Sequence, residues 1–510
     1  MPNDPPDLAS QAAGLTVGAM LLHQARLRPD HPAIEDGPRR KNFAHFNARV
    51  NRLANHLSDL DIRRGDRVAI LAENRLEYLE TLFAAAKIGA IVAALNWRLT
   101  DPELRHCIAL VSPKTLLVAP AYAATIDRLG VSAGEAITLG DDYETRLERA
   151  SDTEPHCQVE AEDGLIILYT SGTTGMPKGA LISHRALVAR AFSSCVDFEL
   201  AAGDSFVAWA PMYHMASAEQ SITVLCLGGK VAIIPGYDPD RIIDAAENMP
   251  QWWLVLMPGM IGDMIDALRR RPGFRPAPIK LAGAMADLVP RQQLAEITAR
   301  LRTPYANTFG STETGLPPFS AGRIAPGTVP QRLSKTPSAG GSYRLVDADD
   351  HDVPDGEPGE VAVRGPTLFS GYWNAPDTNA RDFRGGWFHL GDVCRRNPDG
   401  TVDFVDRVKY MIKSGGENIY PAEIERVLLT DPRVSEAVVV RRADARWGEV
   451  PVAFVVCNDV TEAELLSLCR TELAGYKRPK EIRFIATDHL PRSTTGKVQR
   501  HEIEKWLLTP

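Results

Sequence analysis

The clearest chemical signal is the glycine-rich stretch YTSGTTGMPKG at 169–179, directly after the apolar run LIIL. The backbone can approach an anion closely at its glycines, which are Gly172, Gly175 and Gly179. Hydroxyl donors and one compact positive charge surround them, from Thr170, Ser171, Thr173, Thr174 and Lys178. Backbone N–H groups, hydroxyls and an ammonium together suit a polyphosphate. The stretch therefore predicts a phosphate-binding loop.

The spacing differs from that of a Walker A loop, which needs Gly-x4-Gly-Lys-Ser/Thr. Here Lys178 precedes Gly179 and Ala180. A mobile Gly/Ser linker is the plainer alternative, but such a linker is not expected directly on a buried strand. We therefore expect a phosphate-binding loop of another class.

A second group with chemical potential lies in FGSTETG at 309–315. Thr312 offers a hydroxyl and Glu313 a hard carboxylate oxygen, the kind of ligand that Mg²⁺ prefers beside phosphate oxygens. An isolated Thr-Glu pair is most often a plain surface feature. The pair gains weight only from its neighbours in the sequence.

The elements that must position these residues alternate along most of the chain. Strand patterns occur at 67–71, 115–119, 165–170 and 230–235. A helical pattern runs from Val289 to Arg302, with Leu294, Ile297 and Leu301 on one face. This alternation predicts an α/β fold in which helices cover a sheet.

The pattern changes after a turn signal at Asp399-Gly400. Strand patterns at 438–440, 452–457 and 482–485 surround a helix that starts with a capping box of Thr461 and Glu464. We therefore expect a small α+β domain of its own, with the boundary between Asp406 and Lys409.

Composition limits the classes of function. A chain of 510 residues is too long for a single hydrophobic core, so two or more domains are expected. Its composition, with 44% hydrophobic and 24% charged residues, is ordinary for a globular protein. A net charge of −8 argues against nucleic acid as the main partner, and seven scattered cysteines without a CxxC pair suggest neither zinc nor disulfides. No signal peptide and no membrane-spanning apolar run are recognised, so a cytoplasmic enzyme is expected.

The chain resembles the adenylate-forming superfamily of acyl-CoA synthetases, adenylation domains and luciferases. The similar segments are, in order, 87–100, 169–179, 210–217, 307–315, 386–392, 406–425 and 491–500. One glycine loop alone would be a weak match, whereas the whole ordered series is specific. The resemblance implies an N-terminal ATP- and acyl-binding domain of layered sheets and helices (1–405), a hinge (406–409) and a mobile C-terminal lid domain (410–510). It also implies ATP, Mg²⁺ and, as co-substrate, coenzyme A.

The resemblance also assigns roles on the nucleotide side. It implies that Glu313 binds Mg²⁺, that Thr312 contacts phosphate and carboxylate, and that Phe309 lies against the adenine. Many members have Tyr in place of Phe309, and losing that hydroxyl should matter little. Asp392 is expected to accept the ribose hydroxyls and Arg407 to contact ribose or phosphate. Further ATP or AMP contacts are implied for Asn307, Thr308, Gly310 and Lys413.

Lys497, in the last motif, is implied as the catalytic lysine. Its ammonium would stabilise the charge that builds up on the α-phosphate and the carboxylate during adenylation. A thiol must then reach the acyl carbonyl, and members of the family rotate the small domain about a hinge that matches Lys409. Rotation would bring the residues implied to face coenzyme A to the acyl group. These residues are Gly415, Gly416, Glu417 and Asn418.

The acyl pocket is implied to have His214 as a gate. Its expected lining is mainly apolar and comprises Met215, Met257, Gly283, Ala284 and Met285, so an apolar acid is predicted. Amino-acid-activating relatives carry an Asp where this chain has the neighbourhood Tyr213-His214-Met215. An α-amino acid is therefore not expected, while fatty, aromatic and bulky alicyclic acids stay open.

The resulting hypothesis is an AMP-forming acid–thiol ligase that makes an acyl-AMP and then an acyl-CoA. The main alternative is an adenylating enzyme that passes its acyl-AMP to a carrier protein or a separate transferase. Luciferase-like oxygenation and non-catalytic nucleotide binding are weaker alternatives. Expected partners are a small-molecule carboxylic acid and, under the alternative, an acyl-carrier protein; a homodimer is compatible, and neither nucleic acid nor membrane insertion is expected.

Overall fold

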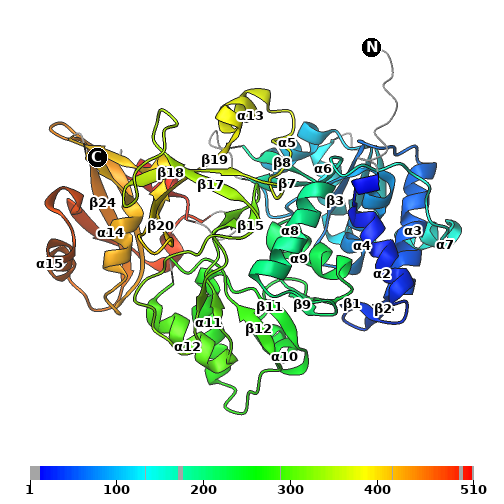
Figure 1. The fold of residues 1–510 in the computed structure, drawn as a ribbon, viewed down its shortest axis with the longest axis horizontal. Coiled ribbons are helices and arrows are strands. Elements are labelled where there is room, and N and C mark those ends of the chain that lie inside the picture. Colours follow the sequence, from blue (N-terminus) through cyan, green and yellow to red (C-terminus); the bar gives the residue numbers. More distant parts are fainter. Residues whose placement is uncertain are drawn as a thin grey trace.

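The computed structural model describes residues 12–131, 134–170, 176–287, 289–415, 417–492 and 498–507. Figure 1 shows a large body of sheets and helices with a smaller unit, which carries the C-terminus, at one end of the long axis. The fold is mixed α/β with a large N-terminal and a small C-terminal domain, as the sequence predicts. No helix within the described ranges has the length and apolarity needed to cross a bilayer.

The first sheet has six strands, in the order β6 (Glu135–Thr138), β5 (Thr115–Val118), β3 (Arg67–Leu71), β4 (Ile91–Ala94), β7 (Gly164–Thr170) and β8 (Lys178–Ser183). All neighbours are parallel except β7 and β8, which are antiparallel, with Thr170 opposite Lys178. Strands β4 and β5 are buried along their whole length, as expected for a parallel sheet covered on both faces. The first-half helices are α2 (Val17–Leu27), α3 (Phe43–Asp59), α4 (Leu76–Ile88), α5 (Asp101–Val111), α6 (Ala123–Leu129) and α7 (Asp141–Arg149).

The second sheet has eight strands, in the order β16 (Arg323–Ile324), β13 (Tyr305–Ala306), β12 (Ile279–Ala282), β11 (Gln251–Leu254), β9 (Ser205–Ala208), β10 (Lys230–Ile233), β1 (Pro32–Asp36) and β2 (Arg39–Asn42). Neighbours from β13 to β1 are parallel. Its helices are α8 (His184–Asp197), α9 (Met215–Cys226), α10 (Pro239–Asn248), α11 (Ile261–Arg269) and α12 (Arg291–Leu301). The last of these confirms the helix predicted at 289–302.

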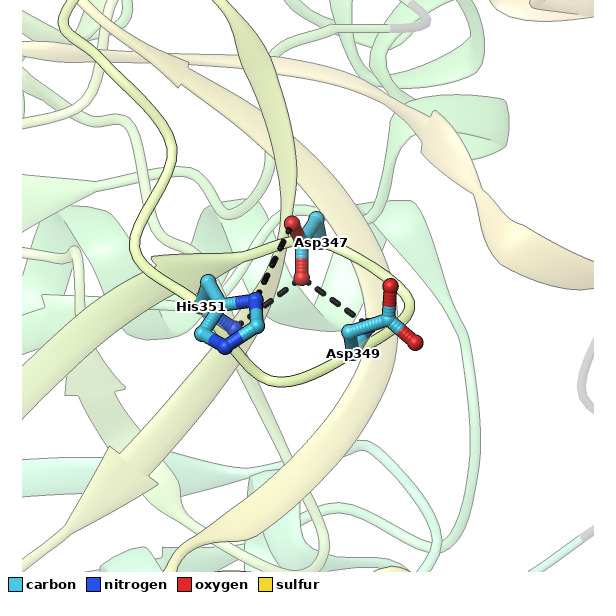
Figure 2. A group of neighbouring side chains, drawn as sticks. All are labelled: Asp347, Asp349 and His351. Carbon is cyan, nitrogen blue, oxygen red and sulfur yellow. Dashed lines mark hydrogen bonds and ion pairs between the residues drawn. The ribbon is translucent and has the colours of Figure 1, made fainter.

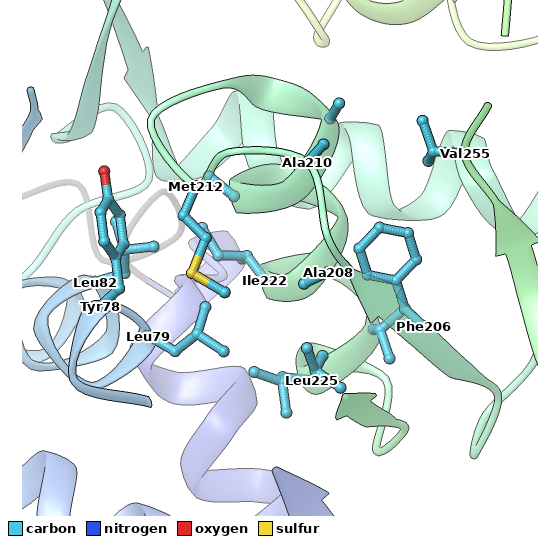
Figure 3. Close-up of a cluster of buried hydrophobic side chains, with 14 of the residues drawn as sticks. Tyr78, Leu79, Leu82, Phe206, Ala208, Ala210, Met212, Ile222, Leu225 and Val255 are labelled. Carbon is cyan, nitrogen blue, oxygen red and sulfur yellow. The ribbon is translucent and has the colours of Figure 1, made fainter. Parts of the chain in front are cut away.

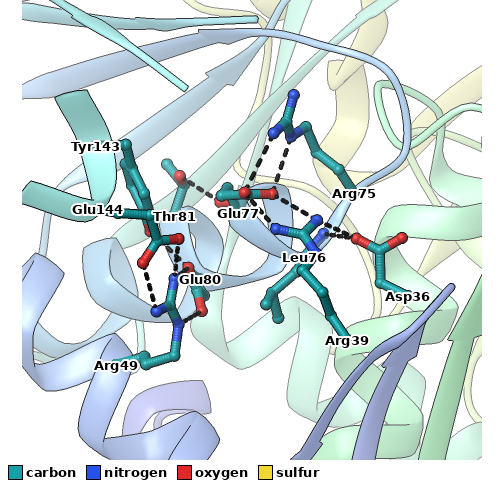
Figure 4. Close-up of polar contacts among 10 residues, drawn as sticks. All are labelled: Asp36, Arg39, Arg49, Arg75, Leu76, Glu77, Glu80, Thr81, Tyr143 and Glu144. Atoms are coloured by element: carbon teal, nitrogen blue, oxygen red, sulfur yellow. Dashed lines mark hydrogen bonds and ion pairs between the residues drawn. The ribbon is translucent and has the colours of Figure 1, made fainter. Parts of the chain in front are cut away.

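Helix α4 is buried along its whole length and joins the two halves of the core. Figure 3 shows Leu79 and Leu82 of α4 near Ile222 of α9 and Phe206 of β9 in one apolar cluster. Figure 4 shows how the carboxylates of the same helix are neutralised. Arg49 pairs with Glu80 and Glu144, Tyr143 donates to Glu80 at 2.6 Å, and Glu77 pairs with Arg39 and Arg75. These pairs allow charged groups inside the core.

A third, antiparallel sheet orders β17 (Ser342–Val346), β18 (Pro358–Arg364), β19 (Phe388–Arg396) and β20 (Val402–Arg407). The hairpin of β14 (Gly310–Ser311) and β15 (Gly315–Pro318) and helix α13 (Pro376–Asp382) belong to the same half of the chain. In the turn after β17, Asp347 accepts the backbone N–H groups of Asp349 and His351 at 2.9 and 3.0 Å (Figure 2). Turn closure therefore explains why these three exposed side chains lie close together.

The C-terminal sheet orders β22 (Glu417–Ile419), β21 (Ile412–Ser414), β24 (Gly448–Cys457) and β23 (Val434–Asp444), with β25 (Glu481–Phe484) also paired to β24. Its helices are α14 (Pro421–Leu428), α15 (Glu462–Glu472) and α16 (Arg500–Lys505). The Thr461–Glu464 capping box is confirmed at the start of α15. Apolar side chains from Ile412 to Leu507 form clusters separate from the main core, whose last buried member is Val402.

Candidate active site

Four neighbouring parallel strands bring the predicted binding segments together. Strands β9, β11, β12 and β13 end at Ala208, Leu254, Ala282 and Ala306. The segments around His214, Met257, Gly283 and Asn307 follow these strand ends directly. Open α/β sheets bind ligands outside the carboxyl ends of their strands. The topology therefore places the predicted acyl and adenine segments at one edge of the sheet.

The glycine-rich stretch meets the Thr312–Glu313 turn through a tyrosine. The Lys178 ammonium lies 4.1 Å from the ring centroid of Tyr372, and the Tyr372 hydroxyl donates to Glu313 Oε1 at 2.8 Å. The backbone supports this contact, because Ala180 bridges to Tyr372 and the Trp373 N–H donates to the Gly179 carbonyl at 2.8 Å. Burial lowers the pKa of Lys178 and raises that of Tyr372. Lys178 and Glu313, which were predicted separately, are thus linked through Tyr372.

Glu313 fits the role of a magnesium ligand. Its side chain is half-buried, and within the described part of the chain no hydrogen bond or ion pair engages Oε2. A carboxylate oxygen is the kind of hard donor that Mg²⁺ takes alongside phosphate oxygens. Thr312, also half-buried, lies beside it in the same turn. The Glu313 carbonyl accepts the Phe369 N–H at 2.8 Å, which fixes the turn against the segment that carries Tyr372.

Asp392 and Arg407 lie opposite each other on β19 and β20 and form an ion pair, with Nε to Oδ1 at 3.0 Å. The charge of Asp392 raises the pKa of Arg407 further. Strand β19 continues past Asp392 to Arg396, because β18 and β20 both pair with it. Asp392 therefore has the fixed geometry of a strand residue and not that of a turn.

The segment after β13 is buried more deeply than its predicted role suggests. Asn307 Oδ1 accepts the Ala286 N–H at 3.1 Å and Nδ2 donates to the Leu333 carbonyl at 2.9 Å. The fully buried Lys335 also contacts Asn307 and pairs with Asp287. The Asn307 amide thus fixes the segment after β12.

The aromatic residue of this segment packs inward. Phe309 is 4% exposed, and its ring lies 5.5 Å from that of Phe319 and 5.6 Å from that of Phe404. Thr308 is also buried, whereas Gly310 is exposed. A contact of Phe309 with adenine stays a prediction.

The predicted acyl lining lies at the margin of the core. Methionines 215, 257 and 285 are partly buried and pack against it, and Ala284 is half-buried. Gly283 has φ +101°, and a Cβ there would lie 2.4 Å from the Tyr305 ring. His214 Nδ1 accepts the Ala216 N–H at 3.2 Å and thereby caps α9. Capping fixes the orientation of this imidazole, and its role as a gate stays a prediction.

In the C-terminal domain the predicted coenzyme A side is a hairpin. Lys413 pairs with Asn418 across β21 and β22, and both are exposed, as is Glu417. Gly415 has φ +58° in the turn, and a Cβ there would lie 2.7 Å from the Trp447 side chain. Lys409 lies in the single turn that joins β20 to β21, where its carbonyl accepts the Arg441 guanidinium at 2.5 Å. Ser171, Gly172, Thr173, Thr174, Gly175, Gly416 and Lys497 lie outside the described residues.

Comparison with known proteins identifies the family. Residues 21–373 match the AMP-binding enzyme family and residues 423–497 match the AMP-binding enzyme C-terminal domain. The chain belongs to the AMP-binding enzyme family. It is 36% identical to the indoleacetate–CoA ligase of Aromatoleum aromaticum, covering 94% of this chain and 96% of that one. It is 35% identical to the feruloyl-CoA synthase of Amycolatopsis sp, covering 96% and 98%.

Among solved structures, it resembles o-succinylbenzoate–CoA synthetase from Bacillus subtilis in complex with ATP and magnesium ion. The TM-score is 0.82 at 25% identity, over 95% of this chain and 98% of that one. As a member of the acyl-CoA ligase branch of the AMP-binding enzyme family, the chain is an AMP-forming acid–thiol ligase. It uses ATP and Mg²⁺ to convert a small-molecule carboxylic acid into its acyl-AMP, and coenzyme A as the co-substrate that accepts the acyl group.

Two residues of the site were not predicted from the sequence, Tyr372 and Arg190. Tyr372 is 59 residues from Glu313, and nothing local marks the contact. The sequence gives only a weak indication of Arg190, which lies on the same buried face of α8 as Ala186, Leu187 and Ser194. A charged residue on an apolar helical face requires a buried partner.

Proposed function

We propose that the enzyme activates an apolar carboxylic acid with an aromatic ring and transfers it to coenzyme A. The observation that carries the proposal is the convergence of apolar segments beyond β9, β11 and β12, with three methionines at the margin of the core. Methionine side chains adapt to planar rings and make favourable sulfur–aromatic contacts. The relatives' names support the same class, because feruloyl and indoleacetyl groups both contain a ring.

For adenylation we assign the triphosphate to the 171–175 segment and Lys178, and the ribose hydroxyls to Asp392. Glu313 would hold Mg²⁺, which when bound neutralises charge on the phosphate oxygens. The substrate carboxylate attacks the α-phosphate, pyrophosphate leaves, and Lys497 stabilises the charge shared by the two groups. The contact of Lys178 with Tyr372, and of Tyr372 with Glu313, supports a common phosphate and metal region.

For thioester formation we assign the hinge to 406–409, with the turn at Lys409 as its pivot. Two features support this position. The apolar clusters of the small domain begin at Ile412, and the Asp406 carboxylate accepts the Ala422 N–H at 2.7 Å where α14 begins. Rotation would present the hairpin at Lys413–Asn418 to the acyl-adenylate, so that the thiol attacks the acyl carbonyl and AMP leaves.

The substrate class is tested by measuring pyrophosphate release with a panel of acids, with and without coenzyme A. The panel contains arylacetic, arylpropenoic, straight-chain and polycyclic acids, and the acyl-CoA product is identified by mass spectrometry. Arylacetic or arylpropenoic acids should give the highest kcat/KM. A preference for straight-chain acids by more than tenfold would contradict the aromatic assignment but not the ligase reaction.

A further inference from the structure

Arg190 lies directly behind the turn that carries Thr312 and Glu313. It is 4% exposed, on α8. Its Nη2 donates to the carbonyls of Thr312 and Glu313 at 3.2 and 3.0 Å, and its Nε donates to the Thr367 carbonyl at 2.8 Å. One rigid guanidinium therefore holds the turn by two successive backbone carbonyls.

The backbone of the turn is shaped to receive this side chain. Gly315 has φ +76°, and a Cβ there would lie 2.7 Å from Arg190 Cδ. A side chain at 315 would therefore displace the guanidinium from the two carbonyls. The glycine at the end of the turn is needed for contact with Arg190.

The remaining donor of Arg190 meets a carboxylate. Nη1 donates to Glu219 of α9, which is 1% exposed. Burial raises the pKa of Glu219 to about 7, and the charge of Arg190 opposes this rise. Burying an arginine is costly unless it is paired and hydrogen-bonded; Arg190 is paired with Glu219, and each of its three nitrogens donates to at least one acceptor.

We propose that the buried Arg190–Glu219 pair is a positioning device that holds the Glu313 carboxylate in place for the magnesium–ATP complex. Neither residue reaches the reacting atoms. Arg190 acts through the backbone of the turn, and Glu219 acts by orienting and neutralising Arg190. The inference rests on the metal role proposed for Glu313. The new element is that a charged pair within the core holds the turn that carries the Glu313 carboxylate.

The test replaces the pair by apolar residues of similar size, Arg190→Met with Glu219→Leu. Replacing both charges leaves no unpaired ion in the core, so the variant should lose less stability than a replacement of Arg190 or Glu219 alone. Its turn loses both carbonyl contacts. The readout is the affinity for ATP, measured by calorimetry without the acid, at saturating Mg²⁺ and in EDTA.

We expect the gain in ATP affinity given by Mg²⁺ to fall about 10- to 100-fold, as is typical when a residue that orients a metal ligand is lost. Arg190→Lys should give an intermediate loss, because a single ammonium cannot reach all four acceptors at once. Affinity in EDTA should fall much less, because without Mg²⁺ only the contact expected of Thr312 depends on this turn. If the double variant fails to fold, Glu219→Gln is measured in its place, because it keeps the volume and removes the charge. A smaller magnesium effect in Glu219→Gln supports the proposal, and an unchanged effect overturns it.

The control is Arg49→Met with Glu80→Leu, a pair between α3 and α4 in which Glu80 is buried and Arg49 partly buried. It should leave the magnesium effect unchanged. Glu313→Gln separates the two proposals. If Glu313→Gln keeps the wild-type magnesium effect, the metal role fails. If Glu313→Gln loses the effect and the Arg190–Glu219 variant keeps it, only the positioning role is overturned.

Discussion

Replacing Tyr372 by Phe removes one oxygen from the site and little else. The hydroxyl donates to Glu313 Oε1 at 2.8 Å. The ring stays in place because it packs edge-on against Phe369 at 4.9 Å and under the Lys178 ammonium. The variant therefore tests whether this single hydrogen bond prepares Glu313 for its ligand.

The size of the effect follows from the type of bond. A hydrogen bond to a charged acceptor contributes about 1.5–3 kcal/mol. Glu313 is half-buried, so water replaces part of that interaction when the hydroxyl is lost. We take about 1–2 kcal/mol, which corresponds to a loss of about 5- to 30-fold in kcat/KM for ATP.

The assay is pyrophosphate release at saturating acid, with ATP varied at several Mg²⁺ concentrations. Tyr143→Phe is the matched control, because Tyr143 donates to Glu80 at 2.6 Å in the core away from the predicted site. That control should lower stability and leave the ATP dependence unchanged. If Tyr372→Phe alters the ATP and Mg²⁺ dependence no more than Tyr143→Phe does, the proposed link between Tyr372 and Glu313 is wrong.

Three further outcomes are expected. Asp392→Asn should raise KM for ATP about tenfold and leave KM for the acid unchanged, because it removes the charge proposed to hold the ribose hydroxyls and weakens the pair with Arg407. Equal rises in both would contradict the ribose assignment. Burial lowers the pKa of His184 to about 4. As the pH falls below about 6.5, this histidine is therefore protonated in the unfolded chain before it is protonated in the folded one. The folded state loses up to about 3 kcal/mol of stability by pH 4. Urea titrations of His184→Gln should show a flatter pH dependence, and a parallel one would refute this. Gly283→Ala should destabilise the folded protein by at least about 2 kcal/mol in thermal unfolding, because its φ is +101° and the Tyr305 ring is 2.4 Å from the added carbon. Gly259→Ala is the control and should not destabilise it, because the added carbon there meets nothing within 4 Å.

Elements encoded by local pattern were predicted closely. The strand at 67–71 matches β3 to the residue, and the helix predicted at 289–302 contains α12. Each depends on a run of apolar residues whose period matches the element. Strand β19 was not among the predicted strands, and it is held extended through Asp392 by pairing with β18 on one side and β20 on the other.

The chemistry of the site was predictable in part. Motif position led to the prediction of Lys178, Glu313, Asp392 and Arg407 as site residues, and the structure pairs the last two directly. It did not identify Arg190, whose contacts with the 312–313 turn span more than a hundred residues of sequence. Contacts at that separation depend on the packing of α8 behind the turn, which no local pattern encodes.

We propose that Lys497 catalyses adenylation, whereas thioester formation proceeds in a rotated arrangement without it. The most direct measurement compares the two half-reactions in Lys497→Ala, by ATP–pyrophosphate exchange and by acyl-CoA formation from supplied acyl-AMP. We expect exchange to fall by about 10²–10³-fold or more and thioester formation to stay within a few-fold of wild type. An equal loss of both half-reactions in a folded variant would contradict the claim.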